Sequence, residues 1–143
     1  MRISDILRSK GDTVVTVTPE DSVRHLLAML AEHNVGALVV SRDGAGVDGI
    51  VSERDVVRQL HRDPEVLDST VSSIMTADVR TCATDEPIDE LAVLMTERRI
   101  RHVPVVQDDR LVGLVSIGDV VKSRIGQLEF EKEQLEGYIS HSG

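Results

Sequence analysis

The hydrophobic positions of the chain follow a helical period and a strand-like period, and the same order of periods occurs twice. Apolar residues three to four positions apart predict helices around residues 23–30 and 88–95. Short runs rich in β-branched residues predict strands at residues 14–17, 37–40, 49–52, 79–82, 102–106 and 111–116. With a last helix beginning near Asp55 or Asp119, each copy has the predicted order β-α-β-β-α.

A polar motif at the end of one strand makes the repeat explicit. Residues 49–55 read Gly-Ile-Val-Ser-Glu-Arg-Asp and residues 113–119 read Gly-Leu-Val-Ser-Ile-Gly-Asp, a shift of 113 − 49 = 64. Over the preceding helices the shift is 65, so the first copy carries one extra residue in its polar turn at 42–48, where surface insertions belong. The period exceeds the roughly 20–50 residues of solenoid and propeller repeats and suits a small βα module.

These patterns divide the chain into a first copy (1–68), a second copy (69–125) and a C-terminal helical extension (126–143). Residues 3–7, Ile-Ser-Asp-Ile-Leu, are echoed by residues 71–75, Val-Ser-Ser-Ile-Met, which predicts a short lead-in helix for each copy. Apolar residues further on predict one long amphipathic helix from about residue 118 to 140, slightly broken at Gly126. The rest of the chain is too small to bury such a helix. We therefore expect it to pack against a second chain, with packing on its own module as the alternative.

Composition narrows the functional classes. The 143 residues include 16 Lys and Arg against 25 Asp and Glu, a net charge of −9, which disfavours general binding to nucleic acid or to anionic lipid. Aromatic residues make up 1%, so the core must be aliphatic. A single cysteine, Cys82, excludes an internal disulfide and is expected to be buried. No apolar run approaches a membrane span, and the cytoplasm is the expected location.

The repeated motif has a chemical and a purely structural interpretation. A glycine lets the backbone approach a ligand closely. A Ser before a helix offers its hydroxyl and N–H to a phosphate where the helix dipole favours an anion, and an Asp can accept from two ribose hydroxyls. Ser-x-x-Asp is also close to a capping-box pattern that serves the helix alone. The residues by themselves leave both interpretations open.

The doubled order of elements, the strands that follow Val35 and Ile100, and the motif in both copies resemble the CBS domain. The chain is similar to a stand-alone tandem CBS pair from Ile3 to about Ile125. This resemblance implies an α+β fold with mixed sheets, in which two β-α-β-β-α units pack pseudo-two-fold into one module. It implies two clefts that commonly hold an adenine nucleotide (AMP, ADP, ATP or NAD(H)) or S-adenosylmethionine. It also implies flat homodimers built through helices.

The residues expected to bind such a ligand come from both copies. They are Thr16, Gly36, Ala37, Ser52, Arg54, Asp55, Thr81, Arg101, His102, Val103, Pro104, Ser116, Gly118 and Asp119. The resemblance implies that Arg54, Arg101 and His102 often face phosphate. The alternatives are a solvated Arg54, an Arg101 in a surface ion pair and a His102 that is merely hydrogen-bonded at the rim. Residues 35–38 and 100–103 are the expected walls of the adenine slots, and Thr16 and Thr81 either bind the nucleotide or complete a strand edge.

We expect two unequal clefts. The second-copy cleft, with Ser116, Asp119 and the Arg101-His102 pair, is the better nucleotide pocket, whereas the first depends on Ser52, Arg54 and Asp55. No catalytic Ser/His/Asp set, metal-spaced cluster or Walker-type Gly-Lys-Ser is recognisable, so neither an enzyme nor a metal site is expected. The predicted function is regulation or energy sensing, with ligand state passed to a partner protein through rearrangement of a homodimer. The alternative is a ligand-independent interaction or scaffold protein with vestigial clefts.

Overall fold

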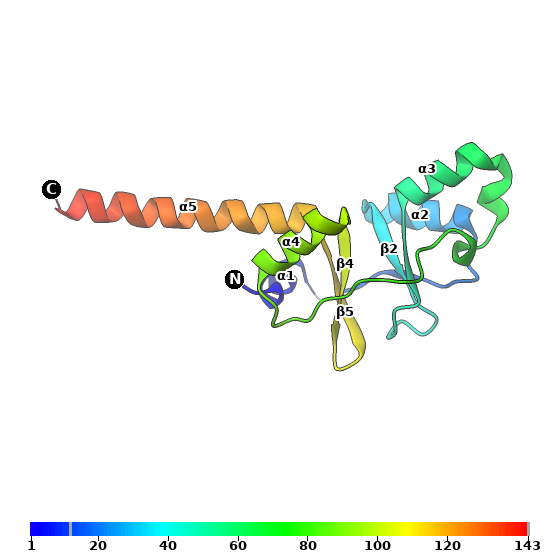
Figure 1. The fold of residues 1–143 in the computed structure, drawn as a ribbon, viewed down its shortest axis with the longest axis horizontal. Helices are drawn as coiled ribbons and strands as arrows, with labels where there is room; N and C mark the ends of the chain where they lie inside the picture. Colours follow the sequence, from blue (N-terminus) through cyan, green and yellow to red (C-terminus); the bar gives the residue numbers. More distant parts are fainter. Residues whose placement is uncertain (12, 143) are drawn as a thin grey trace.

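Two small αβ bodies lie side by side, and one long helix projects from the second of them (Figure 1). The computed structural model describes residues 1–11 and 13–142, with the backbone alone for residues 141 and 142. The elements of the first body are β1 (Thr16–Val17), α2 (Val23–His33), β2 (Ala37–Val40), β3 (Gly49–Ser52), α3 (Glu53–Arg62) and the 3₁₀ helix η1 (Pro64–Asp68). Those of the second body are α4 (Ile88–Arg98), β4 (His102–Gln107), β5 (Arg110–Ser116) and the start of α5 (Ile117–Ser142).

The two sheets share a register but differ in size. In the first body β1 runs parallel to β2, and β2 pairs antiparallel with β3, with Ala37 opposite Ser52. In the second body β4 and β5 pair antiparallel with His102 opposite Ser116, the corresponding position. The predicted strand at 79–82 is shorter than expected, because it reduces to a parallel bridge between Cys82 and Val105. Cys82 is the one buried residue in that run, so only this residue is held against the sheet.

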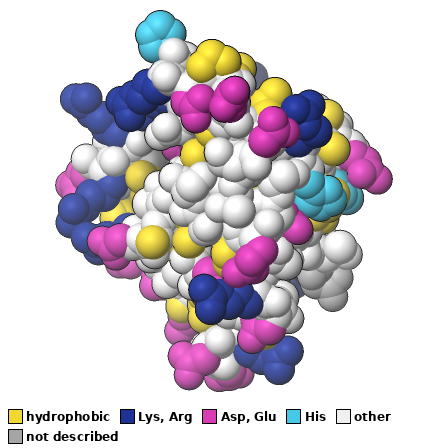
Figure 2. Space-filling model, turned by 90° about the vertical axis from the view of Figure 1, so that its right-hand side faces the viewer, with side chains coloured by type: hydrophobic (Ala, Val, Ile, Leu, Met, Phe, Trp, Pro, Cys, Tyr) yellow, Lys and Arg dark blue, Asp and Glu magenta, His cyan; other side chains and the backbone are white. Residues whose placement is uncertain are grey.

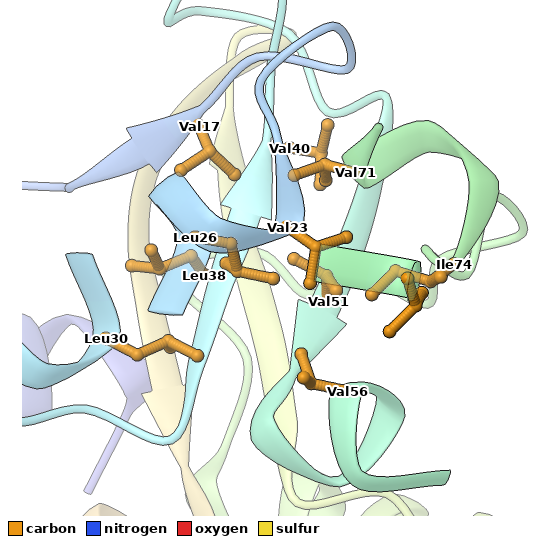
Figure 3. Packing of buried hydrophobic residues seen from close by; sticks show 11 residues of the cluster. Val17, Val23, Leu26, Leu30, Leu38, Val40, Val51, Val56, Val71 and Ile74 are labelled. Carbon is orange, nitrogen blue, oxygen red and sulfur yellow. The ribbon is translucent and has the colours of Figure 1, made fainter. Parts of the chain in front are cut away.

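Each body has an aliphatic core, as the low aromatic content predicts. Figure 3 shows the first core, where Leu26 from α2 and Val51 from β3 are fully buried. The second core contains Ile88, Leu91 and Met95 from α4 with Val103, Val105 and Val115 from the sheet. Cys82 is 3% exposed in this second core, and burial, followed by the nearby Glu86 charge, raises the pKa of its thiol to about 12. The prediction of a buried cysteine is therefore confirmed.

The lead-in segments cross over between the bodies. Ile3 and Ile6 belong to the second core although they precede the first copy, and Val71 and Ile74 belong to the first core although they precede the second. The backbone bonds repeat this exchange. Ile3 N donates to Glu86 O (3.0 Å), and Val71 N donates to Asp21 O (2.8 Å). Each body is thus completed by the segment that introduces the other.

The two lead-in segments differ in form, which departs from the prediction of two similar helices. The first is the eight-residue helix α1 (Ile3–Lys10), whose start is held by the bond from Arg2 N to the Asp5 carboxylate (2.8 Å). The second is only the short 3₁₀ helix η2 (Val71–Ser73). Soon afterwards Thr76 and Ile50 exchange two backbone hydrogen bonds of 2.9 Å, which draws the chain into an extended pairing and ends the helical turn.

Helix α5 runs without interruption over 26 residues, so the predicted break at Gly126 is wrong. One glycine inside a helix costs about 1 kcal/mol relative to alanine, which is too little to end a helix of this length. The helix leaves the body and extends freely in Figure 1. Residue 143 of the predicted extension lies outside the described part of the chain.

The end of the molecule opposite the projecting helix is formed by the first body. On this face Lys and Arg side chains are interspersed with Asp and Glu side chains around a largely uncharged centre (Figure 2). The face therefore offers no broad cationic surface of the kind that binds a nucleic-acid backbone.

Candidate ligand-binding clefts

Both Ser-x-x-Asp motifs form reciprocal caps at helix starts. At α3, Ser52 N donates to Asp55 Oδ2 (2.8 Å) and Asp55 N donates to Ser52 Oγ (3.3 Å). At α5, Ser116 N donates to Asp119 Oδ2 (2.9 Å) and Asp119 N donates to Ser116 Oγ (3.1 Å). The capping role is therefore real in both copies. It leaves room for a ligand, because a carboxylate has about four lone-pair sites.

Asp119 forms an ion pair with Lys10, a residue that the sequence analysis did not predict to belong to the site. Lys10 Nζ, at the end of α1, donates to Asp119 Oδ2 (2.8 Å) and to Leu114 O (2.8 Å). Burial acts to raise the pKa of Asp119, but the hydrogen bonds from Lys10 and Ser116 outweigh it, and the pKa is lowered from 3.8. In the echoed segment the position of Lys10 is taken by Asp78 (10 + 68 = 78). Among the described residues no cation pairs with Asp55, so the two motifs differ in charge.

A cleft of about 130 Å³ lies beside Lys10, and we call it the inter-copy cleft. It lies between the start of the first copy and β5, the strand that carries the motif of the second copy. Its lining residues are Leu7, Lys10, Gly11, Thr13, Val14, Val15, His33, Val35, Ala37, Leu38, Gly113 and Leu114. The predicted slot wall at 35–38 is thus represented here by Val35, Ala37 and Leu38. The cleft is smaller than the roughly 300–1,000 Å³ of ordinary ligand pockets, so a ligand would have to widen it.

A larger groove of about 670 Å³ lies between α1 and α5. Lys10 and Asp119 line it, together with apolar side chains that include Ile6 and Phe130. Lys10 therefore borders both hollows. A movement of its side chain away from Asp119 would alter the inter-copy cleft and the contact between α1 and α5 together.

His102 lies at the junction of the two copies. A side chain added at Gly36 would place its Cβ 3.7 Å from His102 Nε2 and 3.6 Å from Glu53 Oε1, which locates the imidazole against the first body. Burial, followed by the Lys10 charge, lowers the pKa of His102 below 6.5, although Asp119 and Glu53 act in the opposite direction. The surroundings therefore favour the neutral form of the imidazole over the charged form. The ring is close to elements of both copies rather than to the second motif alone.

The other predicted residues divide by burial. Val103 is fully buried in the second core and Pro104 is buried beside it, so the Val103 side chain faces the core rather than a cleft. Thr16 is half-buried in β1. Arg54, Thr81, Arg101 and Gly118 are exposed. The participation of these residues in ligand binding stays a prediction.

The space beside the two motif glycines, Gly49 and Gly113, is filled by other residues of the chain. A Cβ at Gly49 would lie 2.7 Å from Met75 Sδ and 2.9 Å from Thr76 O. A Cβ at Gly113 would overlap the Leu7 side chain. Leu7 and Met75 are the fifth residues of the two echoed lead-in segments. Each glycine is therefore required for the close approach of the crossed segment.

The paired bodies, the matching capped motifs and the crossed lead-in segments are accompanied by a match to the family model "CBS domain" at residues 3–62 and again at 71–126. The chain belongs to the CBS domain family. It is 36% identical over 146 residues to the mitochondrial CBS domain-containing protein CBSX3 of Arabidopsis thaliana, covering 96% of this chain and 71% of that protein.

Solved structures support the assignment. A CBS-domain containing protein from Agrobacterium tumefaciens shares 42% identity with a TM-score of 0.83, covering 87% of this chain and 99% of the other. The CBS domain pair of protein MJ0100, in complex with 5′-methylthioadenosine and S-adenosyl-L-methionine, is 29% identical with a TM-score of 0.79, covering 89% and 98%. The predicted tandem CBS fold is therefore confirmed. CBS pairs of this stand-alone kind are generally regulatory modules rather than catalysts.

Two further findings concern the described residues. They contain no group of three or more His, Cys, Asp or Glu side chains arranged to hold a metal ion. None of their helices combines the length and the apolar character needed to cross a membrane.

Proposed function

We propose that this CBS pair is a regulatory module that binds an adenine nucleotide in the inter-copy cleft, next to Lys10 and Asp119. The observation that carries the proposal is the cleft itself, which lies between the first copy and the motif strand of the second and is lined by Lys10, whose ammonium group is paired with the Asp119 carboxylate. The binding of two adenosine-containing ligands by the related MJ0100 pair supports the ligand class.

The lining of the cleft suits a purine. Val14, Val35 and Leu38 from one copy and Leu114 from the other are aliphatic residues that line it. They would cover the two faces of an adenine without aromatic stacking, and backbone N–H and C=O groups would contact its edge. Phe130 and Tyr138, the two aromatic residues of the chain, both lie on α5.

Polar recognition would come from the ion pair. The Asp119 carboxylate can accept hydrogen bonds from ribose hydroxyls, and the Lys10 ammonium can then bind a phosphate. A cation at this position favours an anionic nucleotide over the positively charged sulfonium of S-adenosylmethionine. We therefore place AMP, ADP, ATP and NAD(H) ahead of S-adenosylmethionine as ligands of this chain.

The same geometry offers a route for the signal. Lys10 ends α1 and Asp119 lies in the first turn of α5, so a nucleotide that draws Lys10 away from Asp119 weakens a tie between these helices. A ligand shifts such an equilibrium only by its difference in affinity for the two states. The altered position of α5 relative to the bodies is the change that a partner protein would detect.

Thermal unfolding with AMP, ATP, NADH and S-adenosylmethionine tests this proposal. Binding to the folded state alone raises stability with ligand concentration, by about 2.7 kcal/mol at one hundred times Kd. Asp119→Asn keeps an oxygen for the helix cap but removes the charge, and we expect it to weaken nucleotide binding at least tenfold. Asp63→Asn, which alters a capping carboxylate at η1, is the matched control and should bind as the wild type does.

Two results would count against the proposal. A melting temperature that no compound raises at millimolar concentration would favour the alternative function, a ligand-independent interaction protein. The capped motifs and the projecting α5 are compatible with that alternative. Equal loss of binding in Asp119→Asn and Asp63→Asn would instead show that the effect is one of stability and not of ribose recognition.

A further inference from the structure

The imidazole of His102 lies in the junction between the two copies, at one end of their sheets. His102 begins β4, opposite Ser116, and therefore belongs to the second body. A Cβ added at Gly36, directly before β2 of the first body, would lie 3.7 Å from both Cε1 and Nε2 of the ring. The corresponding residue of the first copy is Ala37 (102 − 65 = 37), which carries only a methyl group. The contact is therefore made from the second copy alone.

The other end of the junction is held by a backbone hydrogen bond. Leu111 N, in β5, donates to Ala45 O in the polar turn of the first copy (2.7 Å). Leu111 pairs with Val106 near the end of β4, whereas His102 stands at the beginning of that strand. At about 3.4 Å per residue, about 14 Å of strand separates His102 from Val106. The bodies thus have a backbone contact at one end and a titratable side-chain contact at the other, which is the arrangement of a hinge.

Charged groups face the ring from three helices and from the residue before it. The Glu53 carboxylate, at the start of α3, approaches the same point of the first body as the ring does. Lys10 from α1, Asp119 from α5 and the neighbouring Arg101 act on the ring through their charges. The two anions favour the imidazolium and the two cations oppose it. The largest influence is burial, which lowers the pKa of the imidazole.

We propose that the junction is closed around the neutral imidazole and opens at the His102 end when the ring takes up a proton. A charged imidazole is stabilised by water, and burial in the closed junction withholds that water. Opening exposes the ring, so protonation stabilises the open form relative to the closed form. The hydrogen bond between Leu111 and Ala45 is kept and acts as the hinge. This device is built into the fold and needs no ligand.

The opening would also act on the inter-copy cleft. Val35 and Ala37, the two neighbours of Gly36, line that cleft. Movement of Gly36 away from His102 would therefore displace one wall of the cleft relative to Leu114 on the other side. A nucleotide that binds the closed form would oppose the opening, and acid would weaken its binding. This consequence rests on the proposed function, whereas the opening itself does not.

Distances between the two bodies test the opening without a ligand. Nitroxide labels at Arg58→Cys in α3 and Glu97→Cys in α4 occupy exposed positions of separate bodies, and the native Cys82, 3% exposed, should stay unlabelled. Dilution with unlabelled protein removes distances between molecules. Double electron–electron resonance should show one distance at pH 7.5 and a second, longer distance that grows at pH 5.5. One proton on a ring of ordinary pKa in the open form allows the ratio of open to closed to rise up to about tenfold.

Four variants separate the ring from a general effect of acid. His102→Gln cannot titrate, so the second distance should no longer depend on pH, whereas His61→Gln, at an exposed histidine of α3, should respond as the wild type does. Glu53→Gln removes an anion that favours the charged ring in the closed form, so the response to acid should grow. Lys10→Met removes a cation that opposes it, so the response should shrink.

Amide hydrogen exchange at Leu111 supplies the control for the hinge. Its protection should persist at pH 5.5, because the bond to Ala45 is kept; loss of that protection would show that the bodies separate or unfold, and would overturn the hinge. A distance that is the same at both pH values, a shorter distance in acid, or a response that survives in His102→Gln would each overturn the proposal. A shift in the same direction in Glu53→Gln and Lys10→Met would do so as well. None of these outcomes depends on whether a nucleotide binds.

Discussion

The two lead-in segments, residues 3–7 and 71–75, perform the same exchange by different means. Both cross to the other body, both bury their first and fourth residues, and both place their fifth residue over a motif glycine. The first continues as α1 and brings Lys10 to Asp119, whereas the second turns at once into a pairing with Ile50. The buried contacts of the two segments are thus alike, whereas the polar residues that follow each segment make different contacts. That difference makes the two clefts unequal.

The largest effect should come from breaking the exchange itself. Ile6 and Ile74 are equivalent residues that are 5% and 9% exposed in opposite cores. Replacing either by alanine should cost about 2–5 kcal/mol through lost burial and the cavity left behind. Native-state hydrogen exchange should show a crossed pattern: Ile6→Ala lowers protection in β4 and β5, and Ile74→Ala lowers it in β2 and β3.

The crossed pattern is specific to the exchange. If each segment stabilised the copy that follows it in sequence, Ile6→Ala would expose β2 and β3 first. Uniform loss of protection in both variants would show instead that the two bodies unfold as one unit, and the comparison would then have to be made from unfolding rates.

The motif glycines that contact the two lead-in segments, Gly49 and Gly113, should differ in how well they tolerate a side chain. At Gly49 an added methyl meets the Thr76 carbonyl, which is held by a hydrogen bond to Ile50 N (2.9 Å), as well as the Met75 side chain. At Gly113 the three atoms nearest to it all belong to the Leu7 side chain, which can rotate. Gly49→Ala should therefore cost about 1–3 kcal/mol, as overpacking does, and Gly113→Ala less. Urea denaturation of both variants measures the difference, and equal costs would contradict it.

Much of the fold could be predicted from local sequence patterns. The apolar spacing of α2 and α4, the β-branched runs of β2 and β4, and the Ser-x-x-Asp helix starts all depend on neighbouring residues, so the sequence contains them. The first strand of the second copy, expected at residues 79–82, was harder to predict from the sequence. Cys82 is the one residue of its run with a sheet partner, and whether a run pairs along its length depends on the opposite strand. The predicted break at Gly126 was wrong because the free energy that one glycine costs a helix is small beside the stability of a continuous helix.

The candidate site depended on long-range contacts that no local pattern reveals. Lys10 precedes Asp119 by 109 residues, and its role follows from the exchange of lead-in segments. The echo between residues 3–7 and 71–75 was visible, but the alignment gave no sign that each segment would pack on the other body. His102 was predicted from its place at the start of a strand, yet its position against Gly36 depends on how the two sheets face each other.

A smaller effect should follow from removing the cation that distinguishes the second motif. Lys10→Met should destabilise the fold by about 0.5–1 kcal/mol at neutral pH, because the pair is partly exposed. The folded pKa of Asp119 is depressed, so its contribution is complete above 3.8 and is lost as the pH falls through the lower folded value. The difference between variant and wild type should therefore shrink in acid. Arg8→Met, on the same helix, should show a smaller and less pH-dependent change.

The smallest expected effect concerns His102, which lies between the two copies. Its pKa is lowered, first by burial and then by Lys10, so the unfolded chain takes up a proton near pH 6.5 before the folded protein does. Stability should thus decline as the pH falls from about 7.5 to about 5.5, a range in which an ordinary histidine titrates. His102→Gln should flatten that decline, whereas His61→Gln, at an exposed histidine of α3, should leave it unchanged. Urea unfolding at the two pH values measures both slopes, and a slope that survives in His102→Gln would show that the imidazole at the junction is not its source.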